Sequence, residues 1–244
     1  MTPRHPHLLL LPGLVCDDAI WEHQARHLSK VTTVKIADYG ASDSLEKMAQ
    51  VVLQDAPEHF AIAGHSMGGR VAFEILRRVP ERVAGVALLD TAYRPRATGE
   101  AGERERANRF ALLDVARSQG MRAMARQWIP KIVHPDRLSD EAFIASMVEM
   151  IDRKTADIFA AQINALLERR DGAPVLSSLR CPTMILCGRE DLWSPLAGHR
   201  EMAALVPQSK LAIIENCAHM APMERPEEVT SALRDWLDSL DQAH

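Results

Sequence analysis

Residues 60–69 read Phe60-Ala61-Ile62-Ala63-Gly64-His65-Ser66-Met67-Gly68-Gly69, and they contain the most informative motif of the sequence. Its first four residues are an apolar run typical of a buried strand, and residues 70–79 have the apolar spacing of an amphipathic helix that ends before Pro80. The centre matches the pattern Gly-x-Ser-x-Gly, which places a serine on a tight turn between strand and helix. Glycine is needed on either side of the serine because a Cβ there would clash with neighbouring backbone. We therefore predict that Ser66 is a nucleophile at the N-terminus of a helix.

Length and composition exclude several classes of protein. A chain of 244 residues that is 47% hydrophobic can bury a full core, and one domain with an insertion is the expected size. A net charge of −4 with both signs interspersed argues against a nucleic-acid partner. The apolar run before Pro12 is too short for a signal sequence or a membrane span, and the cysteines form no Cys-x-x-Cys pair. We expect a cytoplasmic protein without a membrane or nucleic-acid partner, and no feature of the sequence assigns an oligomeric state.

Short apolar runs predict the strands of a single sheet. They lie at residues 8–11, 31–36, 60–63, 83–89, 183–187 and 211–214. The first four alternate with helical patterns, which predicts an α/β fold with a doubly wound, mainly parallel sheet and right-handed crossovers. Continuous apolar runs are typical of parallel strands that are covered on both faces.

A long helical segment interrupts this alternation. Helical patterns occur at residues 103–118, 121–129, 140–151 and 155–169, with no strand-like run among them. We expect residues 1–91 and 181–244 to form one α/β core, and residues 92–180 to form a helical cap inserted before the fifth strand. The apolar stripe of these helices needs a surface to cover, and the open edge of the sheet is available. Trp128 and Phe143 in this stripe are candidate pocket residues.

The loops after the last two strands carry the other candidate catalytic residues. Ser66 is a weak nucleophile at neutral pH and needs a base, which His219 can supply as a neutral imidazole. The imidazole in turn needs a carboxylate, for which Asp191 is the candidate, and the order Ser, Asp, His is the one associated with this serine motif. An oxyanion hole needs two N–H groups, and those of Met67 and Leu14 are the best placed. No metal or cofactor is needed for this chemistry.

The chain resembles the α/β-hydrolase superfamily, specifically its small members with a helical cap. The matching segments are Leu11-Pro12-Gly13-Leu14, residues 64–69, Gly188-Arg189-Glu190-Asp191, and His219 with Pro222, Glu224 and Pro226. Family members usually carry two strands before the one that ends in the oxyanion loop, whereas this chain starts almost directly on that strand. The resemblance therefore implies six parallel strands in the order second, first, third, fourth, fifth, sixth. Pro12 also replaces the histidine that commonly precedes the glycine of the oxyanion loop.

Other residues compete for the catalytic roles. Glu190 adjoins Asp191, and Asp90 at the end of the fourth strand is an alternative acid because some relatives place it there. We interpret His65 as structural, since it cannot face Ser66 productively from within the same turn. Cys16 lies near the oxyanion loop, but no pattern of partner residues surrounds it.

The arginines allow two interpretations. Five arginines at the start of the cap are interleaved with acidic residues, and we predict that they form a solvent-exposed face. They are Arg94, Arg96, Arg104, Arg106 and Arg109. Arg70 differs because it lies one turn into the helix after Ser66, where it has either a structural role or contact with a substrate carboxylate.

The sequence and the resemblance together favour a serine hydrolase that cleaves a carboxylic ester, or a related activated acyl compound, through an acyl-enzyme on Ser66. The partner would be a small-molecule substrate. One alternative is a C–C bond hydrolase or lyase acting on an acidic substrate, which Arg70 would favour. Another is a small-molecule receptor that retains the triad, because fold alone does not settle function.

Overall fold

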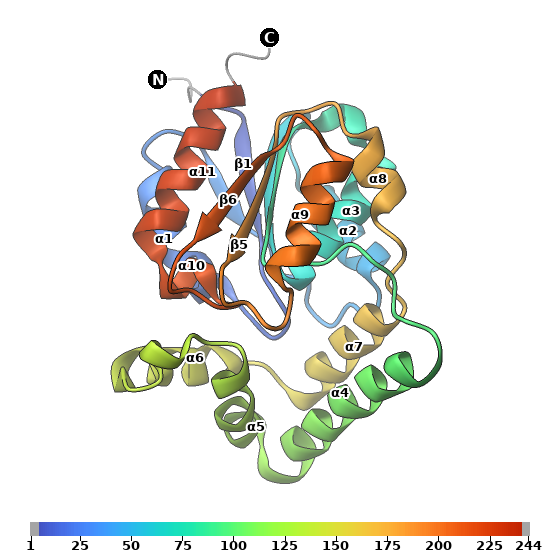
Figure 1. Ribbon diagram of the computed structural model, residues 1–244, viewed down its shortest axis with the longest axis vertical. Helices are drawn as coiled ribbons and strands as arrows, with labels where there is room; N and C mark the ends of the chain where they lie inside the picture. Colours follow the sequence, from blue (N-terminus) through green and yellow to red (C-terminus); the bar gives the residue numbers. More distant parts are fainter. Residues whose placement is uncertain (1–4, 241–244) are drawn as a thin grey trace.

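One sheet of six parallel strands forms the centre of the computed structural model, which describes residues 5–240 (Figure 1). The strands are β1 (His7–Leu11), β2 (Val34–Ile36), β3 (Phe60–His65), β4 (Val83–Leu89), β5 (Thr183–Gly188) and β6 (Lys210–Ile214). Their order across the sheet, β2-β1-β3-β4-β5-β6, confirms the doubly wound arrangement that the sequence predicts. Residues 1–4 and 241–244, which belong to the predicted core, lie outside the described residues.

Helices cover both faces of the sheet (Figure 1). On one face, α1 (Glu22–Leu28) packs against α11 (Pro226–Leu240). On the other lie α2 (Leu45–Gln54), α3 (Met67–Arg78), α8 (Ala173–Ser178) and α9 (Leu196–Leu205). Every residue of β3 and β5 is consequently buried. This double coverage explains why these strands are apolar throughout instead of alternating between apolar and polar residues.

Two details differ from the sequence-based expectation. The strand expected from residue 31 begins only at Val34, because the backbone N–H groups of Val31 and Thr32 donate to the carbonyl oxygen of Leu28 at the end of α1, at 2.9 and 3.0 Å. The helices α8 and α10 (Ala221–Glu224) were not predicted, since six and four residues are too few to show helical periodicity. Short 3₁₀ turns complete the chain: η1 (Asp18–Trp21), η2 (Pro80–Arg82), η3 (Ile129–Lys131) and η4 (Pro135–Arg137).

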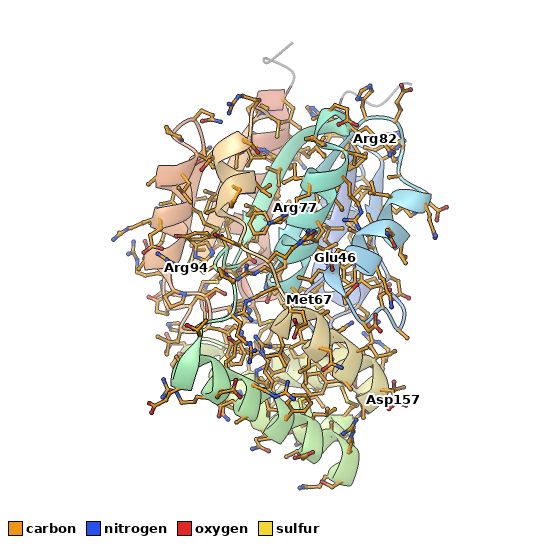
Figure 2. All side chains as sticks on the ribbon, turned by 90° about the vertical axis from the view of Figure 1, so that its right-hand side faces the viewer. Glu46, Met67, Arg77, Arg82, Arg94 and Asp157 are labelled. Carbon is orange, nitrogen blue, oxygen red and sulfur yellow. The ribbon has the colours of Figure 1, made fainter. Side chains whose placement is uncertain are left out.

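Four of the helices between β4 and β5, here called the insertion helices, lie beyond the carboxyl ends of the strands (Figure 1). They are α4 (Gly99–Gln119), α5 (Met121–Trp128), α6 (Glu141–Asp152) and α7 (Ala156–Leu167). Helix α4 packs against α5 and α7, and α5 packs against α6. Figure 2 shows Met67 where α3 meets these helices. No helix within residues 5–240 combines the length and the apolar character that crossing a membrane requires.

Candidate active site

Ser66 occupies the turn between β3 and α3 with a φ of +53°, a left-handed conformation that non-glycine residues rarely adopt. The turn is tight on both sides. A Cβ added to Gly64 would lie 2.6 Å from the carbonyl oxygen of Gly68, and one added to Gly68 would overlap the carbonyl oxygen of Leu11. Backbone strain of this kind persists only where the surrounding structure enforces it. The packed backbone therefore holds the Ser66 hydroxyl at the N-terminus of α3.

His219 connects Ser66 to an aspartate. Its Nε2 lies 2.9 Å from Oγ of Ser66, and its Nδ1 lies 2.8 Å from Oδ2 of Asp191. Because a carboxylate only accepts hydrogen bonds, the proton of the neutral imidazole lies on Nδ1, which leaves Nε2 free to accept from the serine hydroxyl. The other oxygen of Asp191 accepts from the N–H groups of Trp193 and Ser194, both at 2.8 Å. The structure thus brings together all three residues that the sequence indicated for catalysis.

The competing carboxylates have other partners. Oδ1 of Asp90 accepts from the N–H of Gly188 at 2.8 Å, and burial together with the charge of Asp191 raises the pKa of Asp90 well above its usual range. Glu190 accepts from the N–H of Cys217 at 2.9 Å, so it supports the loop that carries His219. Neither carboxylate occupies the position on Nδ1 of His219 that Asp191 holds.

Cys16 and His65 do not compete with Ser66 or His219. Burial raises the pKa of the Cys16 thiol to about 12, so it is not a thiolate nucleophile at neutral pH. His65 donates from Nε2 to the carbonyl oxygen of His219 at 2.7 Å. Burial and the neighbouring His219 lower the pKa of His65 to about 3, so its ring is neutral and holds the His219 backbone in place.

Two further residues hold the catalytic loops, and the sequence interpretation missed both roles. Gln162 of α7 accepts at Oε1 from the N–H of Val15 at 2.7 Å, in the loop after β1. Glu224 accepts from the N–H groups of Ala218 and Met220, on either side of His219, at 3.2 and 2.9 Å. The only sequence signal for Gln162 is an amide inside an apolar helical stripe. Glu224 stands out only as part of the family resemblance.

Two spaces of very different size meet at Ser66. The larger, here called the arginine cavity, measures about 240 Å³. It is lined by Leu14, Ser66, Met67, Arg70, Thr91, Ala92, Glu105, Arg109, Trp128, Leu166, Arg169, Trp193 and Ser194. The smaller, here called the niche, measures about 10 Å³ and is lined by Leu14, Cys16, His65, Ser66, Trp128, Ile132, Met150, Ile151, His219 and Met220. The N–H groups proposed for an oxyanion hole thus belong to residues that line a space next to the Ser66 hydroxyl.

Two of the three candidate pocket residues line a space at Ser66, and the third does not. Trp128 lines both spaces at Ser66, and Arg70 lines the arginine cavity. Phe143 lines neither, and its assignment is corrected here: it is buried near the start of α6, with the Arg137 guanidinium 4.3 Å from its ring centre. The solvated face expected at the start of the cap also needs correction at Arg109, whose side chain is 11% exposed and lines the arginine cavity.

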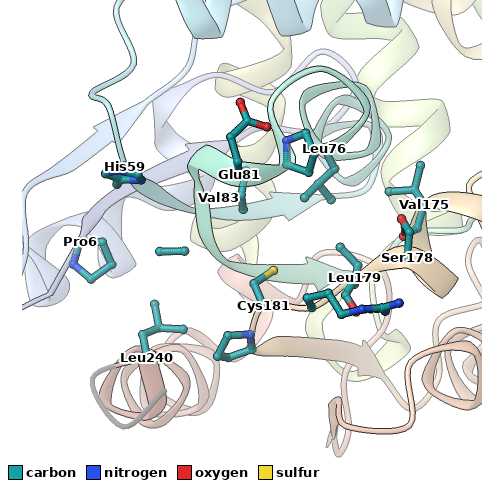
Figure 3. A pocket seen from close by; sticks show the side chains of 14 residues that line it. Pro6, His59, Leu76, Glu81, Val83, Val175, Ser178, Leu179, Cys181 and Leu240 are labelled. Carbon is teal, nitrogen blue, oxygen red and sulfur yellow. Dashed lines mark hydrogen bonds between the residues drawn. The ribbon is translucent and has the colours of Figure 1, made fainter. Parts of the chain in front are cut away.

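A cavity larger than the arginine cavity lies at the other end of the sheet. It measures about 740 Å³ and is lined by residues around the amino ends of the strands, including Pro6, His59, Val83 and Pro182. Figure 3 shows the apolar side chains of Leu179 and Leu240 in this lining. Ligands of open α/β sheets bind at the carboxyl ends of the strands. We therefore do not assign the active site to this cavity, although it is the larger of the two.

One buried group among the described residues has side chains of metal-binding type. Ligand atoms of Asp90, Cys187 and Asp191 lie within 4.8 Å of one another. Burial and both aspartates raise the pKa of the Cys187 thiol, which favours the protonated form over the thiolate that binds metals. Both oxygens of Asp191 already accept hydrogen bonds. The protonated thiol and the engaged Asp191 oxygens therefore do not favour a metal site at these three residues.

Comparison with known proteins assigns the chain to a family. A model of the alpha/beta hydrolase family matches residues 8–232. The chain belongs to this family. Its curated relatives include pimeloyl-[acyl-carrier protein] methyl ester esterases from Nitrosomonas europaea and Aliivibrio fischeri. The first is 23% identical, with 94% of this chain and 95% of the relative covered. The second is 27% identical, with 95% and 93% covered.

Solved structures agree with this assignment. The hydrolase superposes on a thermophilic esterase from Thermogutta terrifontis, solved with malate bound, with a TM-score of 0.87 and 29% identity, covering 98% of this chain and 92% of the other. An enol-lactonase from Burkholderia xenovorans gives a TM-score of 0.82 at 23% identity, covering 96% and 92%. At that lower identity the likeness to the enol-lactonase concerns the fold alone.

Proposed function

We propose that this hydrolase cleaves carboxylic esters through an acyl-enzyme on Ser66. The observation that carries the proposal is the continuous contact from Oγ of Ser66 to Nε2 of His219 and from Nδ1 to Oδ2 of Asp191, at 2.9 and 2.8 Å. The arrangement can move a proton from the hydroxyl to the imidazole while the carboxylate stabilises the imidazolium. The curated relatives are named as methyl ester esterases, which supports ester hydrolysis as the reaction class.

The first half of the reaction forms the acyl-enzyme. Oγ of Ser66 attacks the ester carbonyl carbon as its proton passes to Nε2 of His219. The resulting oxyanion accepts hydrogen bonds from the N–H groups of Leu14 and Met67, which are worth most where water is excluded. The C–O bond to the alcohol then breaks, and the leaving oxygen takes the proton from Nε2. The alcohol departs, and the acyl group remains on Ser66.

The second half uses water as the nucleophile. His219 accepts a proton from the water as its oxygen attacks the acyl carbon, and the same N–H groups bind the new oxyanion. The bond to Oγ of Ser66 breaks, and Oγ recovers the proton from Nε2. The products are a carboxylic acid and the unchanged enzyme.

We also propose that residues 92–180 act as a cap over this site. Trp128 and Leu166 from the insertion helices line the arginine cavity. The N–H of His219 donates to the carbonyl oxygen of Ile132 at 3.1 Å, and the N–H of His134 donates to Glu224 at 2.8 Å. These contacts connect the inserted segment to the loop that carries the proposed base. A cap in this position would exclude water from the acyl-enzyme.

Ester turnover by a Ser66→Ala variant tests the proposal. We expect wild type to hydrolyse methyl acetate and the variant to lose at least about 10³-fold in kcat, since removing a nucleophile leaves only what binding and the oxyanion hole provide. Ser118→Ala, at an exposed position on α4, is the matched control and should retain wild-type turnover. Failure of wild type to hydrolyse any ester, combined with small-molecule binding, would favour the receptor alternative. Turnover restricted to C–C bonds would favour the C–C hydrolase.

A further inference from the structure

The arginine cavity carries an excess of positive charge beside Ser66. Its charged lining residues are Arg70, Arg109, Arg169 and Glu105. Glu105 is already engaged by two of the arginines: Arg169 donates to both of its oxygens at 2.8 Å, and Arg109 donates to Oε1 at 3.0 Å. The single carboxylate therefore leaves the third guanidinium, that of Arg70, without an acidic partner in the cavity lining.

Arg70 is held in place but is incompletely paired. The residue is 6% exposed, and Nη2 donates to the carbonyl oxygen of Arg94 at 2.8 Å. Nη1 is buried and has no hydrogen-bond partner among the described residues. Burial and the charge of Arg169 lower the pKa of Arg70 to about 9, so the guanidinium is still charged at neutral pH. A buried guanidinium that has one unpaired nitrogen and no acidic partner is costly, and a bound anion would lower that cost.

The positions of the two spaces orient an ester on Ser66. In the proposed reaction His219 donates a proton to the leaving alcohol, and His219 lines the niche but not the arginine cavity. A niche of about 10 Å³ accommodates only a very small group such as methyl. The acyl part then extends into the arginine cavity, whose 240 Å³ lies below the range of about 300–1,000 Å³ of typical drug-sized sites.

From this arrangement we infer that the acyl part of the substrate ends in a free carboxylate, so that the substrate class is the small-alcohol monoester of a short dicarboxylic acid. Arg70 binds the distal carboxylate through its guanidinium, and Arg109 and Arg169 contribute the surrounding positive charge. A guanidinium pairs with a carboxylate more strongly than with a neutral carbonyl because the hydrogen bonds are charge-assisted. This inference rests on the proposed ester hydrolysis and adds the chemical class of the acyl group.

The test compares a charged ester with its uncharged isostere. Monomethyl glutarate and methyl 4-carbamoylbutanoate differ only in a distal carboxylate or amide, and the measured quantity is the ratio of their kcat/KM values. Wild type should prefer the carboxylate ester, and Arg70→Gln should lower the ratio by about tenfold to hundredfold, as expected for loss of a charged hydrogen bond. Glu105→Gln should raise the ratio because it removes the negative charge that faces the carboxylate.

The matched control is Arg106→Gln, three residues before Arg109 on the same helix, where the side chain is exposed and does not line the cavity. This variant should keep the wild-type ratio. Equal ratios in wild type and Arg70→Gln, or a lower ratio in Glu105→Gln, would overturn the inference. If Arg70→Gln does not fold, as judged by circular dichroism, the Glu105→Gln variant provides the test. A raised ratio in that variant supports the inference, and an unchanged or lower ratio overturns it.

A binding experiment separates this inference from the proposed reaction. Calorimetric titration of glutarate into Ser66→Ala protein should give saturable binding that Glu105→Gln strengthens and Arg70→Gln weakens by about tenfold. No binding would overturn the carboxylate site even if neutral esters are hydrolysed and the proposed reaction stands. Binding without any ester turnover would retain the carboxylate site and reject the proposed reaction.

Discussion

Gln162 and Val15 lie 147 positions apart in the sequence and share a hydrogen bond of 2.7 Å between the side-chain Oε1 and the backbone N–H. Val15 has a φ of +51°, and the preceding residue is Leu14, whose N–H we assign to the oxyanion hole. The bond therefore connects α7 directly to the loop that must orient this N–H. We therefore propose that Gln162 helps to set the geometry of the reaction centre.

Replacing Gln162 should therefore impair the chemical step. We expect Gln162→Leu to lower kcat for methyl acetate by at least about tenfold, a fraction of the effect of deleting an oxyanion donor. Gln162→Glu keeps an acceptor oxygen and should retain more of the activity. The control is Gln127→Leu at an exposed position of α5. Equal kcat values for Gln162→Leu and wild type would show that the loop needs no such anchor.

The acid of the triad can be identified by two amide substitutions. In Asp191→Asn, Oδ1 still accepts from Trp193 and Ser194, but an NH₂ group facing Nδ1 of His219 forces the proton onto Nε2. That tautomer cannot accept the proton of Ser66, so kcat should fall by about 10³- to 10⁴-fold with little change in KM. Asp90→Asn keeps the acceptor for Gly188 and should cost less than about tenfold. Steady-state kinetics with the reverse ranking would make Asp90 the acid.

Trp128 should limit the size of the alcohol, because it lines both the niche and the arginine cavity. Trp128→Ala should raise the ratio of kcat/KM for butyl esters to kcat/KM for methyl esters, by a factor that corresponds to about 1–3 kcal/mol. Phe143→Ala is the matched control, since this buried aromatic residue of the insertion helices lines neither space. The measurement is kcat/KM across a series of alkyl acetates. An unchanged profile in Trp128→Ala, or a shift in Phe143→Ala alone, would contradict the assigned lining.

Two buried histidines should make the protein less stable in acid. Burial lowers the pKa of His65 to about 3 and that of His199 to about 4. Below the unfolded pKa of about 6.5, the unfolded chain binds protons that the native state excludes, so the free energy of unfolding falls as the pH drops toward these native values. Each histidine contributes a slope of up to about 1.4 kcal/mol per pH unit.

His199→Gln isolates one of these contributions. The Nε2 of His199 accepts from the N–H of Thr91 at 3.1 Å, and a glutamine oxygen can take over this acceptor role without titrating. Urea unfolding at pH 7, 6 and 5 should show that the variant loses about 1 kcal/mol less than wild type between pH 6 and 5. Identical losses in the two proteins would mean that His199 becomes protonated in the native state.

Much of the architecture was predictable because it depends on local patterns. Buried parallel strands are apolar throughout, so β3, β4 and β5 were recognisable from single runs. The Gly-x-Ser-x-Gly turn gave the location of Ser66, because a tight turn restricts which residues can flank it. The loops after β5 and β6 then gave Asp191 and His219, since the carboxyl ends of parallel strands meet at one edge of the sheet.

The remaining features depend on contacts that a helical pattern does not encode. An apolar stripe shows that Trp128 and Phe143 are buried, but not which of them reaches Ser66. Arg109 looked solvated because acids surround it in the sequence, whereas its partner Glu105 also pairs with Arg169 from beyond α7. The hydrogen bond of Gln162 joins two distant segments, and no local signal identifies its partner.

Covalent labelling of the native enzyme tests the central claim, the nucleophilic role of Ser66, most directly. After incubation with a fluorophosphonate probe, peptide mass spectrometry should locate a single stoichiometric adduct on Ser66, and its appearance should parallel the loss of ester turnover. The Ser66→Ala protein should remain unlabelled. An adduct on the peptide that carries Cys16, or full labelling of the Ser66→Ala protein, would contradict the account.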